Sequence, residues 1–176
     1  IYQHPPSIFL SIYRKIRNTA RFILGCIGDF NPDVNAVSDD KLTDIDIWAL
    51  NALNNLIEKV TKGYEKYEYY NVYHAIHHFC VVDMSNFYLD VIKDRLYSEK
   101  ADSETRRAAQ TVIYKVLETL TLLVAPILAF TSEEIWGYMP HSASHDARHA
   151  LYNEFPKTFD LKVDGEFIAR WDRIHN

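Results

Sequence analysis

Apolar residues recur at steps of three and four positions along most of this chain, and this spacing constrains the fold more than any other sequence feature. In the first such stretch, which follows the turn-forming residues Pro5, Pro6 and Ser7, the recurring residues are Ile8, Ile12, Ile16, Ala20, Ile23 and Ile27. The spacing places these residues on one face of an α-helix, which buries that face. The sequence therefore predicts an amphipathic helix that begins at the Pro-Pro-Ser turn and ends near Gly28.

The same spacing predicts two more long helices in the middle of the chain. The second helix is expected to begin near Thr43 or Asp44, and Asn71 is expected to separate it from the third. The buried face of the third helix is predicted to contain Ile76, Phe79, Val82 or Asp83, Phe87, Val91 and Leu96, with Tyr88 and Ile92 beside them. A carboxylate on such a face must be paired, so we expect Asp83 to link two helices. A catalytic role is not expected for Asp83, because no nucleophile or pocket pattern accompanies it.

A fourth long helix and a short fifth one complete the predicted bundle. The fourth is expected to open at Ser103 and to end before Pro126. The segment Thr131-Ser132-Glu133-Glu134 has the form of a capping box, in which Thr131 and Glu134 bond reciprocally at the start of the fifth helix.

Beyond residue 140 the apolar pattern weakens, and a further helix is expected to begin only at Trp171. The sequence therefore predicts an all-α protein. Residues 1–140 should form an antiparallel bundle of four to five helices, and residues 141–176 an irregular C-terminal extension that leads into a truncated helix.

Composition and charge exclude several classes of protein. Apolar residues make up 48% of the chain and charged residues 24%, and no apolar run approaches the ~20 residues that a bilayer requires, so no membrane contact is expected. The net charge is −5, so any nucleic-acid site must be local. Cys26 and Cys80 lack metal-site spacing, which predicts reduced packing residues and a cytoplasmic protein. The first residue is Ile1 rather than Met, so we expect the chain to belong to a longer protein.

One stretch of the first helix is dense in basic and amide side chains. It contains Arg14, Lys15, Arg17, Asn18 and Arg21. The three arginines fall at steps of three and four, so they share a face beside Asn18. Such a stripe is suited to binding phosphates, but a solvated face opposite the isoleucines would have the same spacing. From the spacing alone both interpretations stay open.

A histidine cluster in the third helix is the one candidate metal site. A helix brings His74 close to His77 and His78, but no carboxylate stands at the Glu-x-x-His spacing that bundle metal sites use. We therefore expect no metal and interpret these residues as surface or boundary histidines. The sequence also contains no Gly-rich phosphate loop, HExxH or G-x-S-x-G motif, so it predicts no catalytic residue.

Three longer segments of the sequence resemble a known protein family. They read YRKIRNTARF from Tyr13, YHAIHHFCVVDMSNFYLDVIKDRLY from Tyr73 and LETLTLLVAPILAFTSEEIW from Leu117. From about residue 11 to residue 140, the chain resembles the helical anticodon-binding domain of isoleucyl-tRNA synthetases. The segments FCVVDMSNFYLD and KDRLY resemble the bacterial type of this enzyme. Residues 141–176 match only loosely until RWDRI, which resembles the start of a further helix in that family.

The resemblance implies a fragment of an isoleucine-tRNA ligase that uses ATP and magnesium and acts in the cytoplasm. The partners it implies are the isoleucine-specific tRNA and the catalytic and editing domains of the same parent chain. The family's two adenylation signatures do not occur here, so the fragment should be inactive alone and hold no cofactor. The resemblance also favours tRNA contact by the stripe of Arg14, Lys15, Arg17, Asn18 and Arg21. The alternative is a structural or protein-interaction bundle that binds no nucleic acid.

Overall fold

The computed structural model describes residues 6–175, except for the side chains of residues 6–9 and 172, and within these limits it contains helices and no strand. The longer helices are α1 (Pro6–Cys26), α3 (Asp44–Glu65), α4 (Tyr69–His78), α7 (Glu104–Val124), α8 (Ala129–Tyr138) and α9 (Gly165–His175). The shorter elements are α2 (Pro32–Asn35), η1 (Asp39–Lys41), η2 (Phe79–Tyr88), α5 (Leu89–Val91), α6 (Lys93–Tyr97) and η3 (Ala150–Tyr152). The predicted all-α fold is confirmed. None of the described helices is long and apolar enough to cross a membrane.

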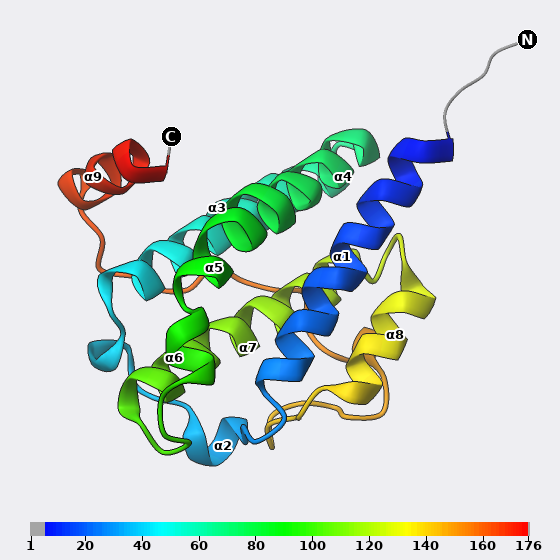
Figure 1. Ribbon diagram of the computed structural model, residues 1–176. Helices are drawn as coiled ribbons and strands as arrows, with labels where there is room; N and C mark the ends of the chain where they lie inside the picture. The colour runs from blue at the N-terminus through cyan, green and yellow to red at the C-terminus, as the bar shows by residue number, and fades with distance from the viewer. Residues whose placement is uncertain (1–5, 176) are drawn as a thin grey trace, which may run out of the picture.

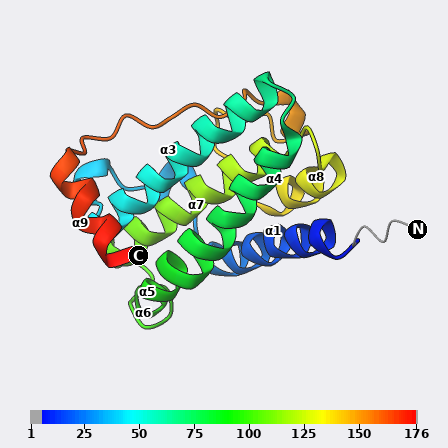
Figure 2. The same cartoon turned by 90° about the horizontal axis from the view of Figure 1, so that it is seen from above.

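Helix α7 lies in the middle of the bundle, with α1, α3 and α8 packed around it (Figures 1 and 2). Of its 21 residues, 15 are buried, including polar ones such as Gln110 and Thr121. A helix that is buried on nearly every side is a core helix rather than a surface one. Its predicted limits are confirmed, since it begins directly after Ser103 and ends at Val124, two residues before Pro126.

The first helix buries the face that the sequence predicts. Ile12, Ile16, Ala20, Ile23 and Ile27 are each at most 4% exposed, whereas the predicted inward position of residue 8 lies outside the described side chains. Each fully buried isoleucine contributes on the order of 1.5 to 3 kcal/mol to folding. This face fixes α1 against the bundle, and the opposite face is left to solvent.

The predicted boundary between the second and third helices is wrong by several residues. Asn71 lies inside α4, and the chain turns instead at Tyr67, whose φ of 59° is left-handed. There the Glu68 amide donates to the Gly63 carbonyl at 2.8 Å, which closes the C-terminal turn of α3. Gly63 is required for this close hairpin, because a Cβ at that position would lie 2.6 Å from a methyl carbon of Val72.

The middle of the predicted third helix is a π-helix, η2, which the sequence pattern did not predict. At its end the backbone amide of Leu89 donates to the carbonyl of Met84, five residues earlier. Bonds from i to i+5 place more residues in each turn than an α-helix does, so the register of the buried face shifts. The prediction that Val91 is buried is therefore wrong: Val91 is 53% exposed, and the neighbouring Ile92 is fully buried.

The predicted capping box at the fifth helix is also wrong. Helix α8 begins at Ala129, two residues before the predicted cap. Thr131 and Ser132 are buried within the helix, and the Ser132 hydroxyl donates to the Thr121 carbonyl of α7 at 2.8 Å. The Glu134 carboxylate is therefore not a cap; it lies 3.7 Å from the Arg17 guanidinium of α1.

The C-terminal extension runs along the bundle as irregular chain, apart from η3, before α9 begins (Figure 1). Asn54 of α3 holds it through two hydrogen bonds to the backbone of Phe159, at 2.7 and 2.9 Å. Helix α9 begins six residues before the predicted Trp171, with the Asp164 carboxylate accepting the amide of Phe167 at 2.7 Å. The division of the chain at residue 140 stays a prediction.

Asp83 occupies the position expected of a polar link between helices. Its carboxylate lies 3.3 Å from a ring nitrogen of His175 in α9 and 3.8 Å from one of His78. Burial raises the pKa of Asp83, and the two nearby histidines act in the opposite direction. The contact joins η2 to the last helix.

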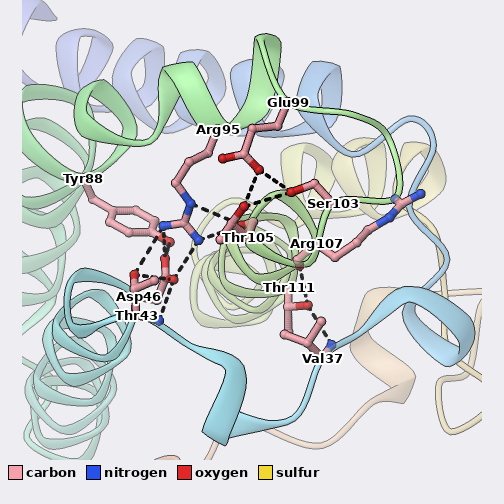
Figure 3. A network of polar contacts seen from close by, with 10 residues as sticks. All are labelled: Val37, Thr43, Asp46, Tyr88, Arg95, Glu99, Ser103, Thr105, Arg107 and Thr111. Carbon is pink, nitrogen blue, oxygen red and sulfur yellow. Dashed lines mark hydrogen bonds and ion pairs between the residues drawn. The ribbon is translucent and has the colours of Figure 1, made fainter.

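A buried polar network ties α3 to α6 and α7 (Figure 3). At its centre the fully buried Asp46 carboxylate accepts hydrogen bonds from Arg95 at 2.9 and 3.1 Å and from the Tyr88 hydroxyl at 2.6 Å. Arg95 also donates to the Thr105 carbonyl at 2.7 Å. A buried charge that is paired and fully hydrogen-bonded holds its neighbours in one arrangement.

Candidate nucleic-acid interface

The residues of the basic stripe predicted from the sequence are exposed along α1. We call it the basic face, and it consists of Arg14, Lys15, Arg17, Asn18 and Arg21. All five residues are exposed, opposite the buried isoleucines of the same helix. Helical geometry alone explains this arrangement. Both the apolar and the basic residues recur every three to four positions, but they start at different positions and so lie on opposite sides of the helix.

The charge of the basic face is local and uncompensated within its own helix. Helix α1 contains four basic residues and no acidic residue, although the whole chain has a net charge of −5. The rest of the chain is therefore still more acidic. A basic surface of this kind attracts polyanions to one place on the molecule.

Most of these side chains are not occupied by other groups of the protein. Among the described residues, Arg14, Lys15, Asn18 and Arg21 have no hydrogen-bond or ion-pair partner, and Arg17 has only the contact with Glu134 at 3.7 Å. Exposed ion pairs of this length contribute about 0 to 1 kcal/mol, so Arg17 is readily redirected to a ligand. The basic face therefore presents cationic donors, together with the Asn18 amide as donor and acceptor.

Helix α1 is flanked by a cleft on each side, and the basic face is divided between them. The cleft toward η2 has a volume of about 180 Å³ and is lined by Lys15, Asn18, Thr19, Phe22, Ser85, Leu89 and Lys93. The cleft toward α8 has a volume of about 170 Å³ and is lined by Arg17, Ala20, Arg21, Leu24, Thr131, Glu134, Ile135 and Tyr138. Figure 1 shows α1 running between α8 on one side and α4 on the other.

The predicted histidine cluster does not gather into a binding site. The His74 ring packs against Tyr70, with centroids 4.2 Å apart. Burial lowers the pKa of His77, and electrostatic interaction with the neighbouring His74 and Lys15 lowers it further. Across the described part of the chain, no group of three or more His, Cys, Asp or Glu side chains could hold a metal ion.

The two cysteines are packing residues, as the sequence predicts. Cys26 and Cys80 are buried and unpaired. Burial raises the pKa of both thiols, and that of Cys80 rises to about 12. A thiol in this state is protonated and unreactive at neutral pH.

Sequence reasoning missed three residues that border the basic face. Lys93 lies in the cleft toward η2, and its ammonium group is 2.6 Å from Asp90. Glu134 and Tyr138 lie in the cleft toward α8. Their spacing of four residues signals a shared helix face, but only the tertiary packing places that face against α1.

Comparison with known proteins identifies the domain family of this chain. The family model described as "Anticodon-binding domain of tRNA ligase" matches residues 46–174. The chain therefore belongs to the anticodon-binding domain family of tRNA ligases. The match begins inside α3, so it does not include the basic face of α1. At its other end it includes the C-terminal extension and most of α9, where the sequence segments themselves resemble the family only loosely.

Particular relatives are described as isoleucine–tRNA ligases. The chain is 46% identical to that of Caldanaerobacter subterraneus subsp. tengcongensis over 163 residues, 50% to that of Syntrophotalea carbinolica over 162 and 52% to that of Caldicellulosiruptor bescii over 164. These matches cover 92–93% of this chain, so they reach into α1. The chain spans 17–18% of the length of these relatives.

Proposed function

We propose that this chain binds the anticodon stem-loop of a tRNA through the basic face of α1, within a bacterial-type isoleucine-tRNA ligase. The observation that carries the proposal is the basic face itself, four cations on an acid-free helix with almost no partners among the described residues. Its guanidinium groups are suited to phosphates, and the Asn18 amide to a base edge.

The parent enzyme would join isoleucine to its specific tRNA in the cytoplasm, with ATP and magnesium as cofactors. The identity of 46–52% with isoleucine–tRNA ligases supports this assignment. The catalytic and editing domains would be its partners within the parent chain. We therefore expect this chain alone to show no isoleucine-dependent exchange of pyrophosphate into ATP, in a preparation free of host enzyme.

Binding to tRNA at several salt concentrations tests the proposal. Each phosphate contact releases condensed counterions, so affinity should fall steeply as salt rises. The variant with Arg14→Ala, Arg17→Ala and Arg21→Ala should bind more weakly and with a flatter dependence on salt. Each lost contact is worth on the order of 1 to 3 kcal/mol.

A matched control separates local contact from overall charge. The variant with Lys66→Ala, Lys100→Ala and Lys162→Ala also removes three exposed positive charges, but none of them belongs to the basic face. It should retain the affinity and the salt dependence of the parent chain. If the two triple variants behave alike, α1 is only a solvated face, and the alternative of a structural or protein-interaction bundle is favoured.

The Asn18→Ala variant distinguishes base contact from phosphate contact. It should weaken binding to the isoleucine-specific tRNA more than to a non-cognate tRNA, and it should leave the salt dependence unchanged. Equal weakening for both tRNAs would mean that Asn18 reads no base.

A further inference from the structure

We propose that α9 is a pH-controlled latch, which docks more firmly on the bundle when His175 is protonated and forms an ion pair with Asp83. The proposal concerns the docking of one helix within the chain and does not depend on RNA binding by the basic face. Helix α9 lies at one end of the bundle, beside the first turns of α3 (Figures 1 and 2). None of its described side chains belongs to the buried core, so its release would leave that core intact.

A narrow stripe of side chains attaches α9 to the bundle. Phe167, Trp171 and His175 recur every four residues and are half-buried, whereas the other described side chains of this helix are exposed. The His175 ring contacts Trp48 of α3 and Phe87 of η2, with centroids 5.1 and 5.2 Å apart. An isolated helix of 11 residues is marginal in water, so the helical state of α9 depends on this docking.

The contact between His175 and Asp83 depends on charge. The Nε2 atom of His175 lies 3.3 Å from a carboxylate oxygen of Asp83, and both side chains are 16% exposed. The same nitrogen is buried and has no hydrogen-bond partner among the described residues, so the neutral ring gains little from the carboxylate. The protonated ring forms an ion pair that solvent screens only weakly. His175 also lies in the last turn of α9, where the helix dipole favours a cation.

The other charged groups that face Asp83 come from helices of the bundle itself. His78 of α4 lies 3.8 Å from the carboxylate and is 65% exposed. Lys59 of α3 is exposed and acts on the same carboxylate electrostatically. Neither residue belongs to α9, so a positive charge on either of them does not attach the helix. Only His175 converts protonation near Asp83 into docking of α9.

The remaining charges of α9 do not respond to pH in the range of imidazole titration. Arg170 pairs with Asp44 of α3 at 2.8 Å, and Glu166 and Arg173 are exposed. Arginine and acidic side chains ordinarily keep their charges between about pH 5.5 and pH 8. Among the described residues of the helix, His175 is therefore the group whose charge changes in this range.

A solvent-accessible cavity borders the contact, so His175 can exchange protons while α9 stays docked. The cavity has a volume of about 530 Å³, and Lys59, Asp83 and His175 are among the residues that line it. Imidazole ordinarily takes up its proton near pH 6.5, so the attraction should be present below about this pH and lost as pH rises above it. Burial raises the pKa of Asp83, and the attraction is lost again once this carboxyl is protonated at lower pH. Docking should therefore be strongest in a mildly acidic window.

Hydrogen–deuterium exchange of the 176-residue chain measures this docking. The amides of α9 exchange when the helix is released, whereas those of the buried helix α7 exchange when the whole bundle unfolds. Rates are corrected for the pH dependence of intrinsic exchange, and α7 serves as the reference for global unfolding. The protection of α9 should be about threefold to tenfold higher at about pH 6 than at about pH 8.

Three variants identify the group that responds to pH. His175→Gln keeps a polar side chain that takes up no proton, so the protection of α9 should no longer change between the two pH values. His78→Gln makes the same change beside the same carboxylate but on α4, and it should keep the change of the parent chain. Arg170→Gln removes the pair with Asp44 and should lower the protection of α9 by the same factor at both pH values.

The outcomes decide the proposal without reference to RNA. Equal protection of α9 at both pH values in the parent chain, or a change that survives His175→Gln, would overturn the latch. Loss of the change in His78→Gln would overturn it too, because the response would then originate in α4. Each of these results leaves the salt-dependent binding of tRNA by the basic face to be judged by its own test.

Discussion

Two sets of arginines in this molecule have opposite surroundings. The partly buried set consists of Arg95, Arg106 and Arg107, whose side chains are 16%, 13% and 15% exposed. Each of them is paired with a carboxylate within 3.4 Å. The exposed set belongs to the basic face of α1, where the only such contact among the described residues is that of Arg17, 58% exposed, at 3.7 Å.

The difference separates arginines that hold the fold from arginines available to a ligand. Arg106 and Arg107 bind Asp29, which fixes the turn after α1 to the central helix α7. Removing one partner of such a pair leaves the charge of the other partner uncompensated, which destabilises the folded chain. No comparable penalty applies on the basic face, because water solvates its side chains in both the folded and the unfolded chain.

The largest effect on stability should come from Arg95→Ala. This change leaves the fully buried Asp46 carboxylate without its cation, which typically costs about 3 to 5 kcal/mol. Urea unfolding followed by circular dichroism measures the loss. Tyr88→Phe is the graded control, because it removes one hydrogen bond to the same carboxylate and should cost about 1.5 to 3 kcal/mol. If Arg95→Ala lowers the free energy of unfolding by less than about 1 kcal/mol, Arg95 does not hold the fold and behaves like the exposed arginines.

A smaller, pH-dependent effect is expected at Asp29. Hydrogen bonding by Arg106 holds the pKa of the Asp29 carboxyl well below its usual range, so the unfolded chain takes up the proton first as pH falls. The contribution is therefore fully present above the ordinary aspartate pKa of about 3.9 and is lost as pH falls toward the lowered value.

The Asp29→Asn variant measures this contribution. The side chain is 42% exposed, so solvent screening limits the difference in unfolding free energy to about 1 kcal/mol at pH 7. That difference should shrink between about pH 5 and pH 2. Asp83 and Glu118, whose pKa values burial raises, are present in both chains and largely cancel. A difference that stays constant with pH would show that the pair contributes through packing instead.

Replacement of the basic-face arginines should change stability least among single variants. Arg14→Ala, Arg17→Ala and Arg21→Ala should each shift the free energy of unfolding by at most about 0.5 kcal/mol, while each weakens RNA binding. The same urea titration provides the measurement. A loss above about 1.5 kcal/mol for any of them would mean that the residue supports the fold, and the contrast between the two sets would fail there.

The smallest effect concerns the contact between Arg17 and Glu134. A double-mutant cycle with alanine at both positions should give a coupling energy below about 0.5 kcal/mol at moderate salt, and less at high salt. A coupling above 1 kcal/mol that persists in high salt would make the pair a structural clamp across the cleft. Such a clamp would leave Arg17 unavailable to a phosphate.

Much of the bundle follows from the sequence alone, because helical periodicity and helix ends depend on nearby residues. The positions of Ile12, Ile16 and Ile23 on one face fix both the buried side of α1 and the opposite, basic side. Ser103 stands at the N-cap position of α7, and Pro126 follows its end, so both limits are likewise marked by nearby residues. The residues of the basic face could therefore be named before any packing was known.

Only the tertiary structure decided how these helices deviate and meet. The π-helical register of η2 depends on how Met84 and Tyr88 pack, since no local signal distinguishes i+5 from i+4 bonding. The predicted cap Thr131 is buried inside α8 instead of opening it, and the neighbouring Ser132 hydroxyl donates to a carbonyl of α7. The two clefts beside α1 likewise exist only because α8 and η2 approach it from elsewhere in the chain. Periodicity assigns each residue to a face of its helix. Which other helix packs against that face depends on how the complete hydrophobic core is buried.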